Sequence, residues 1–369
     1  MLGVHWFLPT GGDSRDVLPS APDAIRRAPD LAYLAQVATA CDALGFDAML
    51  TPCGTGCEDA WLATAALVAL TRRIKFLVAF RPALLTPTLA AQMASTHQRL
   101  SNGRLLVNIV TGAESAELAR FGVFEDKDTR YERTGEFIEV MRGAWSGTPH
   151  DFDGDHYSVR GATTRDVPDP IPPIFFGGAS DAAERVAARH VDVYLTWGEP
   201  PDMAAERVAR MRALAAEHGR TLRFGIRFHV ITRPDAAAAW AAADDLLAGM
   251  EPEAIAAAQR DFAATESVGQ RRMAELHGGT TDRLEVYPNV WAGIGLVRGG
   301  VGTALVGSHD DVTARILEYH ALGFDEFIFS GYPHLEEAYW FGEGVLPRLR
   351  DLGLARPLER PDGPVFSFR

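Results

Sequence analysis

The chain has 369 residues, of which 47% are hydrophobic and 23% charged, the proportions of a globular protein with a substantial core. Its formal net charge of −13 disfavours binding to nucleic acid or to an anionic membrane, because contacts with phosphates need clustered cations. The N-terminus shows no signal-peptide pattern, and no apolar run approaches the roughly 20 residues that span a bilayer. We therefore expect a cytoplasmic protein with neither nucleic acid nor membrane as a partner.

Short runs rich in β-branched and aromatic residues alternate with longer segments of helical period, which is typical of β-α units. The runs predict strands at 4–8, 46–51, 73–80, 104–110, 173–176, 191–196, 222–231 and 325–330. The other segments predict helices at 31–44, 59–71, 87–100, 130–146, 180–189, 202–217, 236–248 and 334–352. Because no GxGxxG follows the first strand, the pattern favours one α/β domain over 1–369, a (β/α)8 TIM barrel, over an open dinucleotide-binding sheet.

Residues 249–307 interrupt this repeat between the seventh and eighth strands. The stretch is too long for an ordinary β-α connection and ends in the glycine-rich run GIGLVRGGVGTALVG. Glycines permit backbone conformations that other residues resist, so we expect this insertion to contain a mobile lid. A surface loop or a contact between subunits is the alternative.

The three cysteines, Cys41, Cys53 and Cys57, are too few and too close together for a disulfide framework. Cys53 and Cys57 have no second cysteine pair and no nearby histidine to complete a zinc site. The first strand also ends without an HxH pair. We therefore expect no metal, and we disfavour a metal-dependent barrel hydrolase.

Polar and aromatic side chains follow the predicted strands, where barrel enzymes carry their chemistry. Arg227 and His229 are two positions apart on one strand and so face the same side. An arginine on a buried face is costly without an anion, which favours a functional site at this strand. A structural ion pair for Arg227 and a core position for His229 are the alternatives.

The segment FFGGASDAAERVA runs from a buried strand through two glycines into a helix. Such a turn directs free backbone N–H groups and the positive end of the helix at its occupant, for which a phosphate is suited. Ser180 adds a hydroxyl donor. An ordinary connection with a serine cap is the alternative.

Longer motifs, in one order, carry a resemblance that covers nearly the whole chain. They are WFLPT at 6, CEDAWL at 57, IKFLVAFRP at 74, RLSNGR at 99, RYE at 130, YLTWGEPP at 194, RFGIRFHVI at 223, NVWAGIGLVRGGVGTALVG at 289 and SGYPHLEEAYWFGE at 330. Together they resemble the bacterial-luciferase-like flavin monooxygenases, and within them the FMNH2-dependent alkanesulfonate monooxygenases.

The resemblance implies a luciferase-like barrel that forms a homodimer or homotetramer. It also implies a two-component system, in which a separate NAD(P)H-dependent FMN reductase supplies reduced FMN and O2 is the co-substrate. By matching motif, the sulfonate and oxygen chemistry falls on Cys57, Trp197, Arg227, His229, Arg298 and Tyr332. The flavin site falls on Ala79, Asn108, Thr111, Tyr131, Gly178 and Ser180, with the last three near the phosphate.

The sequence departs from the family pattern in two places. Residues 9–13 read PTGGD where the family has PTHGD, and GAESAELARFG follows Thr111 where a stretch like GSDPQELAGDG is usual. Both departures reshape the predicted pocket. Alternative substrates are therefore a sugar sulfonate such as sulfoquinovose, or methanesulfonate, and a flavin-binding barrel without turnover is a further alternative.

The expected chemistry follows from the substrate class. A carbon that bears a sulfonate offers no good electrophile for hydrolysis, so we expect oxygenation of that carbon and expulsion of sulfite, which leaves an aldehyde. Arg227 and Arg298 suit the sulfonate or peroxide charge, because a guanidinium is planar and stays protonated. His229 and Tyr332 are candidates for proton transfer, and the sequence leaves open which of them is the base.

Overall fold

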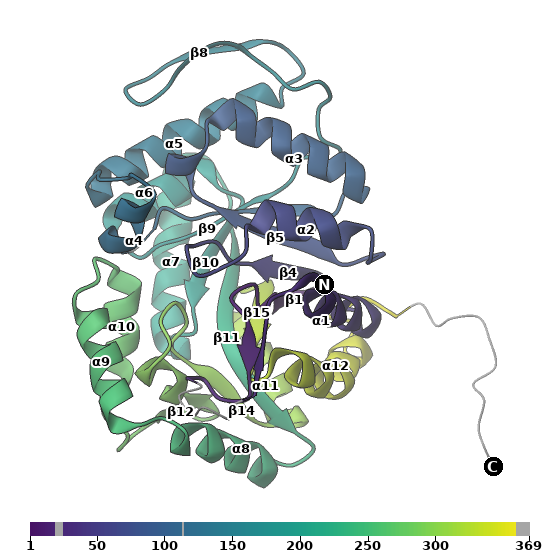
Figure 1. The fold of residues 1–369 in the computed structure, drawn as a ribbon, viewed down its shortest axis with the longest axis vertical. Coiled ribbons are helices and arrows are strands. Elements are labelled where there is room, and N and C mark those ends of the chain that lie inside the picture. The colour runs from purple at the N-terminus through teal and green to yellow at the C-terminus, as the bar shows by residue number, and fades with distance from the viewer. Residues whose placement is uncertain (19–24, 113, 359–369) are drawn as a thin grey trace, which may run out of the picture.

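A computed structural model describes residues 1–18, 25–112 and 114–358 of the chain. Residues 19–24, 113 and 359–369 of the predicted 1–369 domain lie outside the described residues. Eight parallel strands form a closed barrel, with the eighth paired to the first (Figure 1). They are β1 (Gly3–Phe7), β4 (Ala48–Thr51), β5 (Lys75–Phe80), β6 (Leu105–Ile109), β9 (Ile174–Gly177), β10 (Val193–Trp197), β11 (Arg223–Arg233) and β15 (Glu326–Ser330). The predicted (β/α)8 TIM barrel is confirmed.

A ring of helices surrounds the barrel, and each helix of the ring contacts the next. Its members are α1 (Leu31–Leu44), α2 (Ala60–Val68), α3 (Pro87–Ser101), α5 (Lys127–Ala144), α6 (Asp181–His190), α7 (Pro201–Glu217), α11 (His309–Leu322) and α12 (His334–Asp351). The helix α11 was not predicted from the sequence, and 236–248 was predicted to be the helix of the seventh β-α unit. That helix, α8 (Ala236–Ala248), forms, but it packs on β11 and the added strand β14 (Ala304–Ser308) instead of filling the ring.

The insertion is built on the far half of β11. The near half of this strand, from Gly225 to His229, pairs with β15, and its continuation to Arg233 pairs in parallel with β14. The insertion also contains α9 (Pro252–Ala263), α10 (Val268–His277), β12 (Glu285–Tyr287), β13 (Val290–Trp291) and the 3-10 helix η2 (Gly293–Leu296). Because β11 extends beyond the end of β15, its neighbour in the barrel, it places these elements at the side of the barrel mouth.

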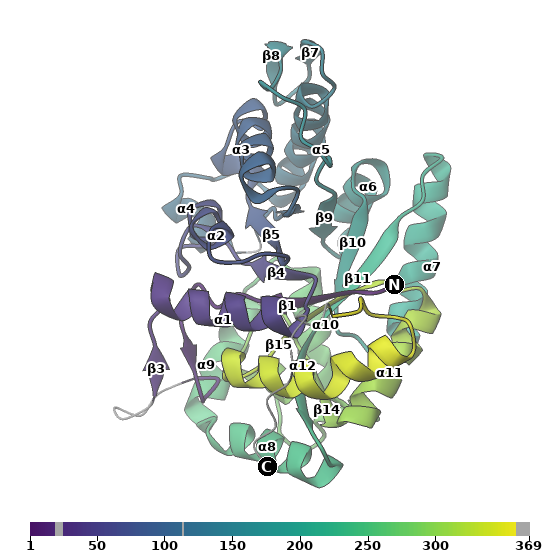
Figure 2. The ribbon, with the colours of Figure 1, turned by 90° about the vertical axis from the view of Figure 1, so that its right-hand side faces the viewer.

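Smaller elements decorate the barrel. They are β2 (Asp13–Ser14) with β3 (Arg26–Arg27), the hairpin β7 (His150–Asp153) with β8 (Ser158–Ala162), the short helix α4 (Ser115–Arg120) and the 3-10 helix η1 (Pro82–Leu84). Figure 2 shows the β7–β8 hairpin projecting beyond α3 and α5. No helix among the described residues is long and apolar enough to cross a membrane.

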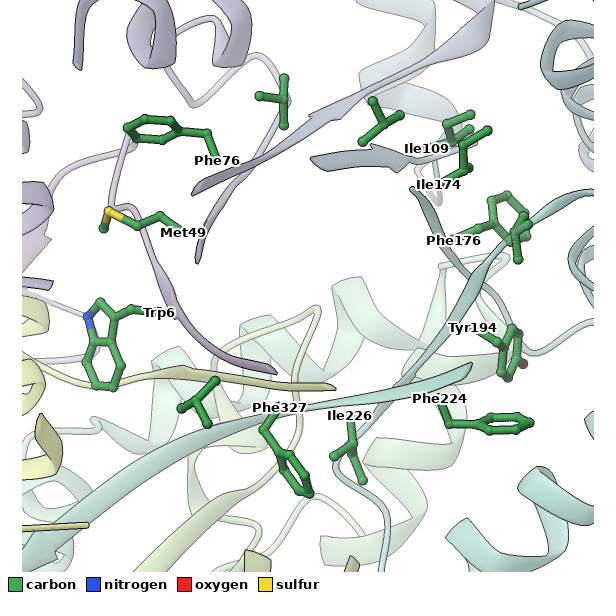
Figure 3. Packing of buried hydrophobic residues seen from close by; sticks show 14 of the residues in the cluster. Trp6, Met49, Phe76, Ile109, Ile174, Phe176, Tyr194, Phe224, Ile226 and Phe327 are labelled. Carbon is green, nitrogen blue, oxygen red and sulfur yellow. The ribbon is translucent and has the colours of Figure 1, made fainter. Parts of the chain in front are cut away.

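The core lies in two layers, because successive side chains of a strand face opposite sides. Phe7 packs inside the barrel, while its neighbour Trp6 packs between strands and helices. Figure 3 shows part of this outer layer around the barrel, with labels on Trp6, Met49, Phe76, Ile109, Ile174, Phe176, Tyr194, Phe224, Ile226 and Phe327. Burial of each such side chain contributes about 1.5–3 kcal/mol to folding, so the barrel is a rigid platform for the loops at its mouth.

Candidate active site

A cavity of about 360 Å³ opens at the C-terminal ends of the strands. Its walls come from the ends of the barrel strands, from the start of α5 and from the insertion, which contributes Ser267, Val268, Gly269 and Gly300. Eight of the twelve predicted site residues line it: Ala79, Asn108, Thr111, Tyr131, Gly178, Ser180, Trp197 and Arg227. The structure thus places all six predicted flavin residues in one cavity.

The turn after β9 leaves room at one end of this cavity. Gly178 has a φ of +153°, and a Cβ there would lie 2.6 Å from the Cβ of Ala183 and 3.1 Å from the hydroxyl oxygen of Tyr131. Ser180 caps α6, where its hydroxyl accepts a hydrogen bond of 3.4 Å from the backbone N–H of Ala183. Only glycine keeps this space open in front of the helix N-terminus, which is the geometry that an anion uses.

Two cations, Lys127 and Arg130, line the same end of the cavity. Neither was predicted as a site residue. Lys127 begins α5, and Arg130 lies one turn later, beside Tyr131. Arg130 has a side chain only 4% exposed, and its Nη2 donates to Oε2 of Glu266 at 3.0 Å, while Lys127 donates to the backbone oxygen of Glu266 at 3.2 Å. The Nε of Arg130 has no hydrogen-bond partner among the described residues. Lys127 and Arg130 are three positions apart on one face of α5, and this spacing in the sequence could have identified them as a pair.

The insertion rests on the loop that follows β10. Glu199 accepts hydrogen bonds from the buried Arg207 at 3.2 Å and from Arg272 of α10 at 2.6 Å. A Cβ at Gly269 would lie 3.2 Å from the indole of Trp197, so the start of α10 packs directly against this predicted site residue. The insertion therefore closes one side of the cavity.

Arg227 lies at the opposite end without a counterion. Its guanidinium sits 4.6 Å from the ring centroid of Phe7, its Nε has no hydrogen bond, and no carboxylate pairs with it in the described part of the chain. Burial, and then the positive charge of Arg298, lower the pKa of Arg227 to about 9. The ion pair that was the alternative for this residue is thus not found in those residues, and an anionic ligand would relieve the cost of this half-buried charge.

His229 lies beside these two arginines. Its Nδ1 is 2.9 Å from the hydroxyl oxygen of Ser330, its ring stacks on Tyr332 with centroids 5.4 Å apart, and its Nε2 is buried without a partner in the described residues. Burial and the charges of Arg227 and Arg298 hold the pKa of His229 well below its ordinary value. His229 is therefore neutral near pH 7.

Arg298 and Cys57 complete this group, although neither they nor His229 and Tyr332 line the main cavity. Arg298 lies just after η2, and its positive charge acts on Arg227, His229 and Cys57. Burial raises the pKa of the Cys57 thiol, and Arg298 opposes part of that rise. These residues form a positively charged wall next to the cavity.

Asp13 and His334 were not predicted as site residues. His334 begins α12, and its Nδ1 lies 2.8 Å from Oδ1 of Asp13. The His334 ring contacts Tyr332 edge-on, with centroids 5.3 Å apart, and Phe7 at 5.5 Å. Both lie within motifs already quoted, PTGGD and SGYPHLEE, so the signal was their proximity to predicted residues.

A (β/α)8 barrel with a glycine turn before a helix N-terminus and an arginine wall at its mouth has the architecture of enzymes that carry their active site at the C-terminal ends of the strands. The sequence matches the family model of the luciferase-like monooxygenases over residues 2–326. The chain belongs to this family.

Solved structures share the fold. The riboflavin lyase RcaE, determined with modified FMN and riboflavin, gives a TM-score of 0.79 at 23% identity over 96% of this chain and 93% of that one. DmoA from Hyphomicrobium sulfonivorans gives 0.79 at 20% identity over 98% and 90%. The EDTA monooxygenase EmoA from Chelativorans sp. BNC1 gives 0.74 at 20% identity over 96% and 95%. At these identities the similarity establishes the fold alone.

Proposed function

We propose that this protein is the oxygenase of a two-component system, which uses reduced FMN and O2 to cleave an organosulfonate to an aldehyde and sulfite. The observation that carries the proposal is Arg227, a half-buried cation whose Nε is buried without a hydrogen-bond partner and which has no carboxylate partner in the described residues, beside a second cation, Arg298. In the balanced reaction, one oxygen atom of O2 ends in the aldehyde and the other in water. Reduced FMN supplies two electrons, and the sulfonate leaves as sulfite.

The residues present fit the phosphate of FMN. The space in front of Gly178 would be filled by any Cβ, and the Nε of Arg130 is buried without a partner in the described chain. Tyr131, Gly178 and Ser180, with Lys127 and Arg130, would hold the phosphate. Ala79, Asn108 and Thr111 would contact the ring system. When bound, reduced FMN supplies the electrons that activate O2.

The protein's own contribution is to bind, orient and exclude water. Arg227 and Arg298 bind the sulfonate oxygens, because a guanidinium offers several coplanar donors. Neutral His229 adds a polar contact without adding charge. The start of α10 covers the cavity beside Trp197, and closure of the insertion at 249–307 would protect reactive oxygen species from solvent. A protease should therefore cut this insertion more slowly when flavin and sulfonate are bound.

The partners belong to the same proposal. An NAD(P)H-dependent FMN reductase supplies the flavin, and the chain assembles as a homodimer or homotetramer in the cytoplasm. Exposed leucines on and next to α2 and α3 support self-association, with Leu62 74% and Leu100 68% exposed. Light scattering after size exclusion measures the assembly.

The decisive experiment is sulfite release across a panel of alkanesulfonates, methanesulfonate and sulfoquinovose, with reduced FMN supplied by a reductase. We expect stoichiometric sulfite and aldehyde from at least one member. Tight flavin binding with no sulfite from any member would favour the flavin-binding barrel without turnover, and would contradict the proposal.

A further inference from the structure

Two histidines lie in the wall beside the cavity, without lining it, and their electrostatic surroundings are opposite. His229 is buried and faces the positive charges of Arg227 and Arg298. His334 instead meets the carboxylate of Asp13, with 2.8 Å between its Nδ1 and Oδ1 of that residue. A carboxylate stabilises a protonated imidazole, whereas two guanidinium groups destabilise one. Of the two rings, His334 is the one that is hydrogen-bonded to a carboxylate in the described residues.

Asp13 is held as an ionised acceptor. Its side chain is fully buried, and Oδ1 accepts from the backbone N–H of Ser14 at 2.9 Å. Oδ2 accepts from the backbone N–H of His334 at 2.9 Å and from the hydroxyl of Tyr33. Burial alone would raise the pKa of Asp13, but hydrogen bonds and charge from His334, with the hydrogen bond from Tyr33, bring it below its ordinary value.

This geometry fixes the tautomer of His334. An ionised carboxylate only accepts hydrogen bonds, so Nδ1 of His334 carries the hydrogen and Nε2 has the free lone pair. The backbone is held on both sides, because the N–H binds Asp13 and the carbonyl oxygen accepts from the indole Nε1 of Trp6 at 3.1 Å. The ring is therefore fixed before any ligand binds.

The His334 ring shares two aromatic neighbours, Phe7 and Tyr332, with the residues predicted to bind the substrate anion. Phe7 contacts His334 at 5.5 Å between centroids, and the guanidinium of Arg227 lies 4.6 Å from the same Phe7 ring. Tyr332 contacts both His334 and His229, at 5.3 Å and 5.4 Å between centroids. His334 thus belongs to the same wall as the residue assigned to the sulfonate.

We propose that His334 is the general base for the expulsion of sulfite and that Asp13 is its positioning residue, an inference that rests on the proposed desulfonation. The step is the collapse of a 1-hydroxysulfonate. Nε2 of His334 accepts the hydroxyl proton, the carbon–oxygen double bond forms, and the carbon–sulfur bond breaks with both electrons on sulfite. Asp13 stays ionised and stabilises the imidazolium that results.

A 1-hydroxysulfonate is the adduct of an aldehyde with bisulfite, so this step is testable without flavin. The purified protein, free of flavin, is mixed with the adduct of a medium-chain aldehyde, and released sulfite is trapped with a thiol-reactive disulfide dye. We expect release faster than in buffer alone. His334→Gln should lower this rate about 100-fold, the usual contribution of a general base, and Asp13→Asn about tenfold.

The kinetic constants distinguish a catalytic pair of Asp13 and His334 from a merely structural contact between them. Asp13→Asn should lower kcat for the adduct and leave KM unchanged, whereas Arg227→Leu should raise KM. The matched control is Asp310→Asn, which removes an exposed carboxylate of α11 that pairs with Arg348 of α12 and is not part of the hydrogen-bond network of Asp13 and His334. This control should retain the wild-type rate within about twofold.

The tautomer is measured directly by 15N NMR of histidine-labelled protein, with His334→Gln used for assignment. We expect an unprotonated Nε2 in the wild type, and a protonated Nε2 or a tautomer mixture in Asp13→Asn. The NMR measurement can be made even where a variant is less stable than the wild type, because it needs only the folded fraction of the protein.

Two results would overturn the assignment. One is wild-type protein that does not accelerate sulfite release from the adduct. The other is loss of that activity in His229→Gln with full activity in His334→Gln. A protein that cleaves the adduct but releases no sulfite from any sulfonate with reduced FMN would instead overturn the proposed function and leave the base in place.

Discussion

The two ends of the cavity use arginine in opposite ways. At the glycine-turn end, Arg130 pairs with Glu266 of the insertion at 3.0 Å. At the other end, Arg227 and Arg298 have no carboxylate partner within the described residues. A paired cation is stable without ligand, whereas a partly buried cation without a counterion is tolerated at a cost that an anionic ligand removes. At the proposed cofactor end, the arginine therefore has a counterion before any ligand binds, whereas at the proposed substrate end the arginines have none among the described residues.

The largest expected effect is at Arg227. Arg227→Leu should lower kcat/KM for sulfite release roughly 30-fold or more, a loss of about 2–5 kcal/mol of transition-state stabilisation, because it removes a half-buried charge that meets the anion. The same variant should be no less stable than the wild type, since this charge has no carboxylate partner among the described residues. Sulfite assays and thermal unfolding without ligand measure both.

Arg207 is the control, because it is a buried arginine that pairs with Glu184 and Glu199 at 3.2 Å. Arg207→Leu leaves those carboxylates without this partner and should destabilise the fold by about 3 kcal/mol. If Arg227→Leu were equally destabilising, Arg227 would be a structural residue and the contrast between the two ends would be lost.

The second effect is at Arg298. Arg298→Ala should reduce sulfite release about 10- to 100-fold, the range for losing charged hydrogen bonds, while flavin affinity stays nearly unchanged because the flavin contacts are assigned elsewhere. Arg298→Lys should not restore full activity, since an ammonium lacks the planar fork. A variant with wild-type turnover would show that Arg298 is only a surface residue.

Much of the fold was predictable because each barrel strand is a short apolar run followed by a periodic helix. The ring helix α11 was missed, although its signals are local: Ser308 and Asp311 form a capping box, and Gly323 ends the helix. The preceding strand β14 forms the end of the glycine-rich run, which was assigned entirely to the insertion. Because no strand was predicted there, α11 had no strand before it and was left between the insertion and the strand predicted at 325–330, although its own pattern is clear.

The site was less accessible to sequence reasoning. Residues at strand ends are located by motif spacing, and the structure places Asn108 and Thr111 where that spacing puts them. Pairings across the chain carry no such signal. Asp13 and His334 are 321 positions apart, and Arg130 and Glu266 are 136 apart, so only the closed barrel brings them together.

A smaller effect is expected at Ser180. Ser180→Ala should weaken binding of FMN by about 1–2 kcal/mol, the cost of losing a charge-assisted hydrogen bond to phosphate. Because Ser180 also caps α6, the control is Asp235→Ala, which removes the cap of α8 and touches no cavity residue. Fluorescence titration of both variants separates a phosphate contact from a helix cap, and equal affinity in Ser180→Ala and wild type would remove the contact.

The smallest effect, and the one that tests the paired end, is at Glu266. Its carboxylate occupies Arg130, which is a cation that the flavin phosphate needs, so phosphate and carboxylate compete for the same donor. Glu266 is 46% exposed, and such pairs are worth at most about 1 kcal/mol, so Glu266→Gln should tighten FMN binding by up to roughly fivefold. Riboflavin, which lacks the phosphate, should bind both proteins equally, and Glu253→Gln on the exposed first turn of α9 should change neither ligand. Isothermal titration of FMN and riboflavin decides the matter. Weaker FMN binding in Glu266→Gln would mean that the carboxylate holds Arg130 in place for the phosphate, and the two ends would then differ in preorganisation and not in competition.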